Sequence, residues 1–190
     1  MTGAIILARH GQPALSREVR LSASEYRDWW ARYELGGLQT GQSPPDDLVA
    51  LARGAALVIA STRLRAIESA TLLTAESSFS FDDLYIEAPL PPPPWPEWIR
   101  IGPRAWGFFA RFWWWWFDHH AGEESVREAR ERALLAARRL ADLAAEGQDV
   151  LLVAHGFFNL MIGRALKSMG WRRTFGRGYR YWTVRRYERR

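Results

Sequence analysis

The sequence predicts an α/β fold, a three-layer α/β/α sandwich with a mostly parallel central sheet. Three short, continuous apolar runs lie far apart along the 190 residues, and each one ends in a polar cluster. Runs of this length and continuity are typical of strands that are buried on both faces of a parallel sheet. Helical patterns lie between the runs, and such an alternation of strands and helices favours this class of fold.

Each predicted strand is followed directly by histidine or arginine side chains. The runs and their polar followers are Ala4–Ala8 before Arg9 and His10, Ala56–Ala60 before Ser61-Thr62-Arg63-Leu64-Arg65, and Val150–Ala154 before His155. In open α/β sheets, ligands bind beyond the carboxyl ends of the strands. We therefore expect these side chains to meet at one edge of the sheet.

The predicted helices lie between and after these strands. One helix begins at Ser43–Asp47, a second runs from Arg65 to Ala75, a third runs from Glu123 to Glu146, and a fourth follows His155. The first begins with prolines and acidic residues, which suit the first turn of a helix. The longest has small and apolar residues recurring at three- and four-residue steps, and Gly147 ends it.

A proline- and tryptophan-rich stretch at about 88–120 interrupts this alternation, and we interpret it as an insertion in a single domain that spans residues 1–190. Pro89–Pro96 is dense in proline and must be a loop or an extended segment. Ala105–His120 holds four consecutive tryptophans, Trp113 to Trp116. Neither a helix nor a strand can point all four at one core, so some of them should contact a lid, a partner, a bulky apolar substrate or a membrane interface. The alternative is a helical cap whose tryptophans pack on the sheet and on the segment Pro91–Pro94.

The composition excludes several classes of chemistry. There is no cysteine, so disulfides, thiol nucleophiles and cysteine-ligated metals are excluded. The apolar start, Met1–Leu7, lacks a basic region and a cleavage site, and we interpret it as a strand and not as a signal peptide. No run of 18 apolar residues exists that would predict a membrane-spanning helix. We expect a cytoplasmic protein.

The four side chains predicted at the sheet edge suit phosphate chemistry. Arginines around imidazoles repel a metal cation and attract a phosphate, and no metal-ligand spacing is present. A neutral imidazole can attack phosphorus while guanidinium groups spread the charge of the transferring phosphoryl group. Arg9, His10, Arg65 and His155 therefore point to phosphoryl transfer through a phosphohistidine, without a metal or an organic cofactor.

Four blocks, in this order along the chain, resemble the motifs of the histidine phosphatase (phosphoglycerate mutase-like) superfamily. They are the RHG signature in Leu7-Ala8-Arg9-His10-Gly11-Gln12, the second motif in Ala60-Ser61-Thr62-Arg63-Leu64-Arg65-Ala66, Gly122-Glu123-Glu124-Ser125, and the third motif in Val153-Ala154-His155-Gly156. The blocks follow the order and spacing of that family. The resemblance implies the phosphoglycerate mutase-like version of the predicted fold.

The resemblance also implies roles for individual residues. His10 would be the nucleophile, and Arg9, Arg65 and His155 would form the phosphate pocket, with His155 also counted as catalytic. The family places an acidic proton donor between its second and third motifs, where leucine and glutamate lie close together. Leu84-Tyr85-Ile86-Glu87 fits this description, so Glu87 is the expected general acid.

This chain departs from the family pattern in two places that bear on the site. Gln12-Pro13-Ala14-Leu15-Ser16 replaces the usual run with an asparagine after RHG, and Ser16 is our candidate to replace that asparagine as a phosphate donor. The stretch after Glu87 is rich in proline and lacks the usual glycine and tryptophan pattern. Other acids therefore stay open as the proton donor: Asp82, Asp83 and Glu97.

We expect a phosphatase of the histidine acid phosphatase type that hydrolyses a small phosphomonoester. A phosphoglycerate mutase-type phosphotransferase is an alternative, but the chain is short for such a mutase. A non-catalytic phosphate-binding module that recruits a partner is another. A specific nucleic-acid partner is not expected, because the basic charge is the one feature in favour of it and no recognised nucleic-acid-binding module is present.

The C-terminal stretch from Arg164 to Arg190 is strongly basic and has Glu188 as its one acid. The loose alternation of Tyr179–Arg185 predicts an edge strand with one solvated face. Arginine together with tryptophan also suits a peripheral membrane contact. The sequence leaves the oligomeric state and the identity of the substrate open.

Overall fold

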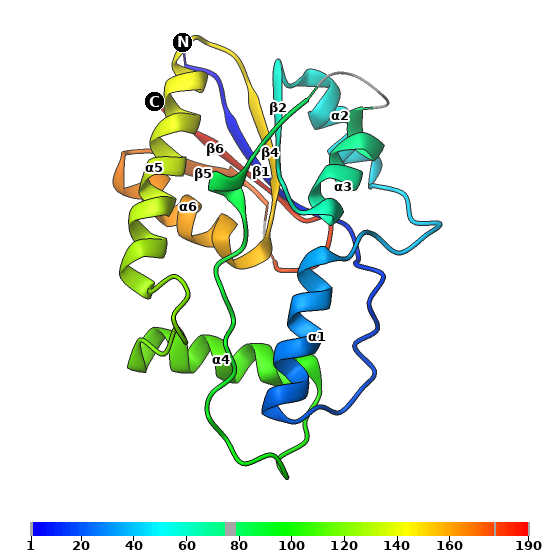
Figure 1. Ribbon diagram of the computed structural model, residues 1–190. Coiled ribbons are helices and arrows are strands. Elements are labelled where there is room, and N and C mark those ends of the chain that lie inside the picture. Colours follow the sequence, from blue (N-terminus) through cyan, green and yellow to red (C-terminus); the bar gives the residue numbers. More distant parts are fainter. Residues whose placement is uncertain (1, 75–78, 177, 190) are drawn as a thin grey trace.

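A sheet of six strands runs through the protein, as the computed structural model shows for residues 2–74, 79–176 and 178–189 (Figure 1). The strands are β1 (Ile5–Arg9), β2 (Leu57–Ser61), β3 (Ser80–Asp82), β4 (Val150–Ala154), β5 (Arg172–Phe175) and β6 (Val184–Glu188). Their order is β3-β2-β4-β1-β6-β5, and the first four are parallel to one another. β6 and β5 are antiparallel additions. The predicted mostly parallel sheet is confirmed, and the three predicted strands are β1, β2 and β4.

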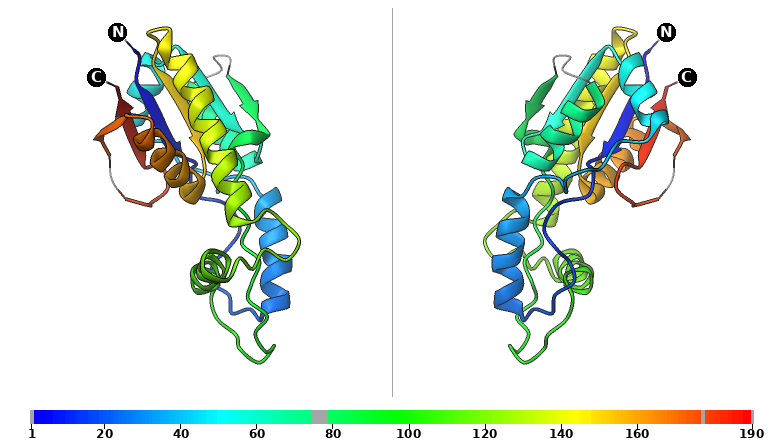
Figure 2. Two further views of the ribbon diagram at one scale, coloured as in Figure 1. Left: turned by 90° about the vertical axis from the view of Figure 1, so that its left-hand side faces the viewer. Right: turned by 90° about the vertical axis from the view of Figure 1, so that its right-hand side faces the viewer.

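Helices cover both faces of this sheet and complete the three layers. α2 (Asp46–Gly54) and α3 (Leu64–Thr74) lie on one face, and α5 (Val126–Ala145) and α6 (Gly156–Ser168) lie on the other (Figures 1 and 2). The side chains of β1 point alternately to the two faces of the sheet. Ile5 and Leu7 pack in the core under α5 and α6, whereas Ile6 packs under α2 and α3. A strand that is buried on both sides has to be apolar at every position, which explains the continuous runs.

The longest helix, α5, begins three residues later than the sequence pattern predicts, because a capping box fixes its start. The Ser125 side chain accepts a hydrogen bond from the Glu128 backbone, and the Glu128 side chain accepts one from the Ser125 backbone. The buried stripe of α5 is made mostly of alanine, so α5 can lie close to α6 and to the sheet. The helix predicted over Arg65–Ala75 is α3, and Ala75 lies outside the described residues.

A second group of elements projects beyond the sheet edge and forms a lobe. It consists of α1 (Ala23–Leu35), α4 (Pro103–Phe117) and the extended segment between residues 86 and 102 (Figure 2). Its core is a stack of aromatic rings, in which Tyr26 lies between Trp29 and Trp106 at centroid distances of 5.9 and 5.7 Å. The predicted insertion at about 88–120 is therefore half of this lobe, and α1 supplies the other half.

The four consecutive tryptophans lie on α4 and point in different directions, as predicted. Trp114 is fully buried in the core that α5 and α6 share, while Trp116 is 70% exposed. Trp113 packs edge-on against Trp95 of the extended segment, at a centroid distance of 5.3 Å. Trp115 lies under the Arg130 guanidinium, whose central carbon is 4.6 Å from the ring centroid. One run of residues thus fastens the lobe to the rest of the protein.

The predicted edge strand over Tyr179–Arg185 is wrong. The strand at this end of the chain is β6, which begins at Val184 and lies inside the sheet between β1 and β5. The exposed edge strand is β5, all four residues of which are exposed. The alternating pattern did not indicate a strand here, because Tyr179 to Thr183 form a turn. This turn brings its tyrosines to the sheet edge, where residues distant in the sequence decide how far they are buried. None of the helices in the described ranges is both long and apolar enough to cross a bilayer.

The packing of α4 predicts that the replacement of Trp114 and the replacement of Trp116 have very different effects on the free energy of unfolding. Trp114→Ala should lower the free energy of unfolding by roughly 3–5 kcal/mol, because it opens a cavity in the core and removes the bond that Trp114 Nε1 donates to the Glu124 carbonyl at 2.9 Å. Trp116→Ala should change it by about 0.5 kcal/mol or less, because that side chain is exposed. Urea unfolding followed by circular dichroism measures both values. Equal losses would contradict the packing described for α4.

Candidate active site

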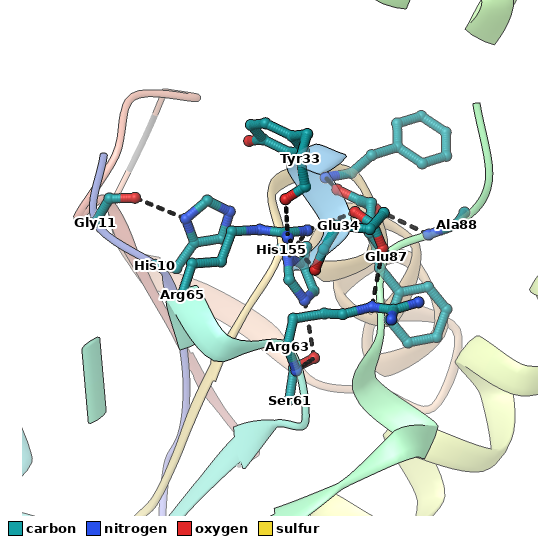
Figure 3. A network of polar contacts seen from close by, with 12 residues as sticks. His10, Gly11, Tyr33, Glu34, Ser61, Arg63, Arg65, Glu87, Ala88 and His155 are labelled. Atoms are coloured by element: carbon teal, nitrogen blue, oxygen red, sulfur yellow. Dashed lines mark hydrogen bonds and ion pairs between the residues drawn. The ribbon is translucent and has the colours of Figure 1, made fainter. Parts of the chain in front are cut away.

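The register of the parallel strands brings two histidines to one edge of the sheet. Arg9 at the end of β1 pairs with Ala154 at the end of β4, so His10 and His155 follow side by side. Their ring centroids are 5.2 Å apart in an edge-on arrangement (Figure 3). Ser61, at the end of β2, lies beside them and bonds to His155. The predicted meeting of the strand ends is thus present in the structure.

His10 is buried and has a defined tautomer. Its Nδ1 lies 2.7 Å from the carbonyl oxygen of Gly11. Since a carbonyl only accepts, Nδ1 carries the proton and Nε2 keeps its lone pair. Burial lowers the pKa of His10 well below 6.5, and the charges of Arg65 and Arg9 lower it further. His10 is therefore a neutral imidazole with Nε2 as its basic nitrogen.

His155 is also buried and neutral. Its Nε2 lies 2.8 Å from Ser61 Oγ, and its Nδ1 lies 3.3 Å from Nη2 of Arg65. An arginine nitrogen can only donate, so Nδ1 accepts and Nε2 donates to Ser61. The pKa of His155 is lowered well below its usual value by burial first and then by the charge of Arg65.

Arg65, near the start of α3, is wholly buried and is held by α1 of the lobe. Its Nη1 donates to the carbonyl oxygens of Tyr33 and Glu34 at 2.9 and 3.2 Å, and its Nη2 donates to the Glu34 carboxylate at 2.7 Å. The other carboxylate oxygen of Glu34 lies 2.8 Å from Nε of Arg63. Glu34, which sequence reasoning missed, thus balances two positive charges at the site (Figure 3).

Two further arginines lie near His10. The guanidinium carbon of Arg9 lies 4.5 Å from the ring centroid of Tyr181, and Arg9 Nη1 donates to the Tyr179 carbonyl. Arg17 donates from Nη2 to the Tyr33 hydroxyl at 2.8 Å. The Nε groups of Arg9 and Arg65 are buried and find no acceptor within the described ranges. They are N–H donors that an anion could satisfy.

Ser16 lies outside this group, although the sequence predicted it as a phosphate donor. Its Oγ accepts a bond from the Glu18 backbone at 3.2 Å, and it lines a separate cavity next to Tyr181. Its neighbour Arg17 lines the cavity that contains His10. The sequence carried no signal for Arg17, because the path of the loop after His10 decides which of the two residues faces inward.

Glu87 follows the short 3₁₀ helix η1 (Asp83–Tyr85) and lies at the N-terminus of α6. Its carboxylate accepts hydrogen bonds from the backbone of Phe157 at 3.2 Å and of Phe158 at 2.8 Å. It is the only carboxylic acid among the described residues that line the cavity around His10. The predicted rivals bond elsewhere: Asp82 to Arg139, Asp83 to Thr62, and Glu97 to Ser24.

Two arginines hold the segment that carries Glu87. Arg132 of α5 donates to the carbonyls of Leu84 and Ile86, both at 2.9 Å. Arg111 of α4 donates to the carbonyls of Ala88 and Pro89, both at 3.2 Å. Burial lowers the pKa of Arg111 to about 10, so it remains charged at neutral pH. The lobe therefore helps to place the acid as well as Arg65.

These residues surround a cavity of about 560 Å³. Its inner end holds the two histidines with Arg9, Arg17 and Arg65, and its walls are largely aromatic, with Trp29, Trp30, Tyr33, Phe108 and Phe157. Five arginines face one carboxylic acid, since Arg104 and Arg111 also line it. Such a cavity attracts an anion that carries an apolar group. In the described part of the chain, no group of three or more acidic or histidine side chains could hold a metal ion.

A comparison with protein families decides where this chain belongs. Residues 47–189 match the model of the histidine phosphatase superfamily (branch 1). The chain belongs to this superfamily. The match begins after His10, so the place of His10 in the site comes from the pairing of β1 with β4. No protein of curated function matches the sequence.

Solved structures with the same fold include phosphatases and a mutase. Phosphoserine phosphatase from Entamoeba histolytica is 14% identical, with a TM-score of 0.56, over 87% of this chain and 80% of that one. A mycobacterial glucosyl-3-phosphoglycerate phosphatase is 20% identical, with a TM-score of 0.54, over 88% and 83%. Phosphoglycerate mutase from Bacillus anthracis is 17% identical, with a TM-score of 0.54, over 99% and 89%. The superfamily and these neighbours support an enzyme with this fold.

The buried Arg65–Glu34 pair predicts a competition between Glu34 and phosphate in this member of the histidine phosphatase superfamily. Glu34→Gln should lower the free energy of unfolding by on the order of 3 kcal/mol, because a buried guanidinium loses its counter-charge. Inorganic phosphate should then raise the melting temperature of the variant more than that of the native protein. Glu188→Gln, which breaks the partly exposed pair with Arg186 on β6, is the matched control and should show neither effect. An equal phosphate response in all three proteins would contradict the competition.

The lowered pKa values of His10 and His155 predict how stability depends on pH. As the pH falls below 6.5, the unfolded chain takes up protons at both histidines while the folded protein resists, so the free energy of unfolding falls. This loss continues until the lowered folded-state pKa values are reached. Unfolding at a series of pH values from neutral to acid measures it. In the double variant His10→Asn/His155→Asn the slope below pH 6.5 should be shallower than in the native protein.

Proposed function

We propose that this member of the histidine phosphatase superfamily hydrolyses a phosphomonoester in two steps through a phosphohistidine on His10, without a metal. The observation that carries this proposal is the state of His10: it is neutral, its proton is held on Nδ1, and three of the five arginines that line its cavity, Arg9, Arg17 and Arg65, lie near it. A neutral imidazole is a nucleophile, whereas a protonated one is not. The neighbouring arginines supply the positive charge that the transferring phosphoryl group needs.

In the first step, Nε2 of His10 attacks phosphorus and the ester P–O bond breaks. The leaving oxygen takes a proton from the Glu87 carboxyl group, so an alcohol departs and Glu87 is left as a carboxylate. Arg9, Arg17 and Arg65 stabilise the negative charge of the phosphoryl oxygens. The phosphoryl group is then bonded to Nε2, and the proton stays on Nδ1, which continues to donate to the Gly11 carbonyl.

In the second step, the Glu87 carboxylate takes a proton from water as the water oxygen attacks phosphorus. The P–N bond breaks, inorganic phosphate leaves, and His10 returns to its neutral form with the lone pair on Nε2. Glu87 is protonated again and ready for another cycle. His155, bonded to both Ser61 and Arg65, positions the arginine and adds no positive charge of its own.

We favour a phosphatase over a phosphoglycerate mutase-type phosphotransferase. A mutase has to retain the phosphoryl group and reorient a bisphosphorylated intermediate, so a fast loss of phosphate from His10 to water would decide between the two. Small phosphorylated molecules are the proposed substrates, in keeping with the phosphatases among the structural neighbours. The histidine acid phosphatase type and a cytoplasmic location stay predictions from the sequence. A His10 that remains neutral under acidic conditions fits activity at low pH.

The proposed route predicts a ranked series of variants in the hydrolysis of p-nitrophenyl phosphate. Turnover should persist in EDTA and vanish in His10→Ala, because no other group accepts the phosphoryl group. Glu87→Gln should lower kcat by about 100- to 10,000-fold, as the loss of a general acid–base group does. Arg17→Ala should raise KM, whereas Ser16→Ala should leave both constants near native values, because Ser16 lies outside the cavity.

The covalent intermediate gives an independent check. Acid-quenched mixtures of the native protein and substrate should contain phosphohistidine, and Glu87→Gln should accumulate more of it if water attack becomes slower than phosphoryl transfer. Phosphate binding without turnover by the native protein across pH 5 to 8 would contradict the proposal and favour the non-catalytic binding module.

A further inference from the structure

One face of α4 carries large aromatic side chains that nothing in the described chain covers. Phe108, Phe112 and Trp116 follow one another at steps of four residues, so they form a stripe along the helix. Phe108 is 67% exposed, Phe112 40% and Trp116 70%, and Phe117 at the end of the helix is exposed as well. We call these four residues the α4 stripe. Both exposed tryptophans of the described chain, Trp116 and Trp98, belong to this lobe.

The α4 stripe belongs to a part of the protein that projects from the rest. The lobe extends beyond the end of the sheet, and α4 runs across it (Figure 1). A helix of 15 residues is about 22 Å long, so the stripe offers a long apolar edge and not a single exposed ring. Contiguous exposed apolar surface of this kind marks a contact with another molecule or with a membrane.

The charges around the stripe distinguish among these partners. α4 contains no acidic residue, and Arg104, one helical step before Phe108, is exposed on the same face. Phenylalanine and tryptophan on one side of a helix, together with arginine, are the side chains that anchor a helix in the headgroup region of an anionic bilayer. The basic C-terminal stretch, which the sequence suggested for a membrane contact, is not part of this face. Its strands β5 and β6 belong to the sheet, Arg164 lies against Trp115, and Tyr179 lines the cavity around His10.

The stripe is continuous with the cavity around His10. Phe108 and Arg104 belong to the stripe face and also line that cavity, beside Pro103 and Gly107. A molecule whose apolar part lies against the stripe can therefore extend its phosphate toward the arginines and His10. The aromatic walls of the cavity suit the apolar part of the same molecule.

We propose that the α4 stripe docks on an anionic lipid surface and that the substrate is an amphiphilic phosphomonoester taken from that surface. The substrate part of this proposal rests on the proposed function, whereas the docking part does not. Phe112 and Trp116 enter the interface, Arg104 contacts lipid phosphates, and Phe108 lines the path into the cavity. The phosphate group of the substrate carries the negative charge, and its apolar chain stays in the lipid.

Docking is tested with the full chain and vesicles of phosphatidylglycerol and phosphatidylcholine. The native protein should co-sediment with these vesicles, and less with phosphatidylcholine alone. Phe112→Ser/Trp116→Ser should bind on the order of tenfold more weakly, because two large apolar side chains leave the interface. Phe81→Ser, which removes a side chain that is 60% exposed on β3, is the matched control and should bind like the native protein.

Activity measurements separate this proposal from the proposed function. His10→Ala should bind vesicles as the native protein does, because docking does not depend on catalysis. The docking proposal can therefore hold even if the proposed function is wrong. Phe112→Ser/Trp116→Ser should hydrolyse p-nitrophenyl phosphate at the native rate, because neither residue lines the cavity. The native protein should prefer dodecyl phosphate in vesicles to glycerol phosphate in solution, and this double variant should lose that preference.

Several outcomes would overturn the proposal. Absence of vesicle binding by the native protein is one, and an equal loss of binding in Phe81→Ser is another. A dimer in sedimentation velocity that Phe112→Ser/Trp116→Ser converts to a monomer would assign the stripe to a second copy of this chain. Equal hydrolysis of dodecyl phosphate and glycerol phosphate would remove the substrate part and leave the docking part.

Discussion

The buried guanidinium of Arg65 is the point at which the two parts of this protein are joined. It belongs to α3, which packs on the sheet, but its hydrogen bonds go to Tyr33 and Glu34 of α1 in the lobe. Taking an arginine fully out of water is costly unless its donors are bonded and its charge is balanced. Here α1 supplies both the counter-charge and acceptors for the two Nη groups, and Nε alone is left without an acceptor in the described residues. The position of the lobe is therefore tied to the residue that, in this superfamily, we expect to hold phosphate.

This arrangement also explains why both histidines are neutral. The same arginines that make the cavity attractive to a phosphate make it unfavourable for an imidazolium ion, and burial acts in the same direction. A positively charged site thus keeps the imidazole of His10 uncharged without an acidic partner. Glu34 is the compensating carboxylate, and it acts on Arg63 and Arg65 instead of on the histidines. A phosphate that enters the cavity adds negative charge near Arg65, so the two anions share one guanidinium.

The parts of the site that could be predicted are those fixed by the parallel sheet. The continuous apolar runs predict β1, β2 and β4, and the parallel register places the residues after them at one edge, so Arg9, His10, Arg65 and His155 could be found. Glu34 and Arg17 could not, because they come from the lobe and a loop whose positions depend on tertiary contacts. The helix α1 did leave a signal in the sequence: Ser22 and Glu25 form a capping box, and Tyr26, Trp29 and Tyr33 repeat at helical spacing. The sequence alone offered no reason to place that helix against Arg65.

Four tryptophans follow one another in α4 because this helix packs against several different parts of the protein. Successive residues of a helix point about 100° apart, so four consecutive tryptophans sample nearly the whole circumference. Trp114 packs in the core of the sheet layer, Trp113 packs on the extended segment, and Trp115 lies under arginine. A helix that has to fix the lobe, hold the peptide after Glu87 through Arg111 and line the cavity needs large side chains on three sides. Those demands account for Trp113, Trp114 and Trp115 but not for Trp116 or its neighbours along the stripe. Burial within the fold therefore explains three sides of α4, and the described part of the chain leaves the fourth side uncovered.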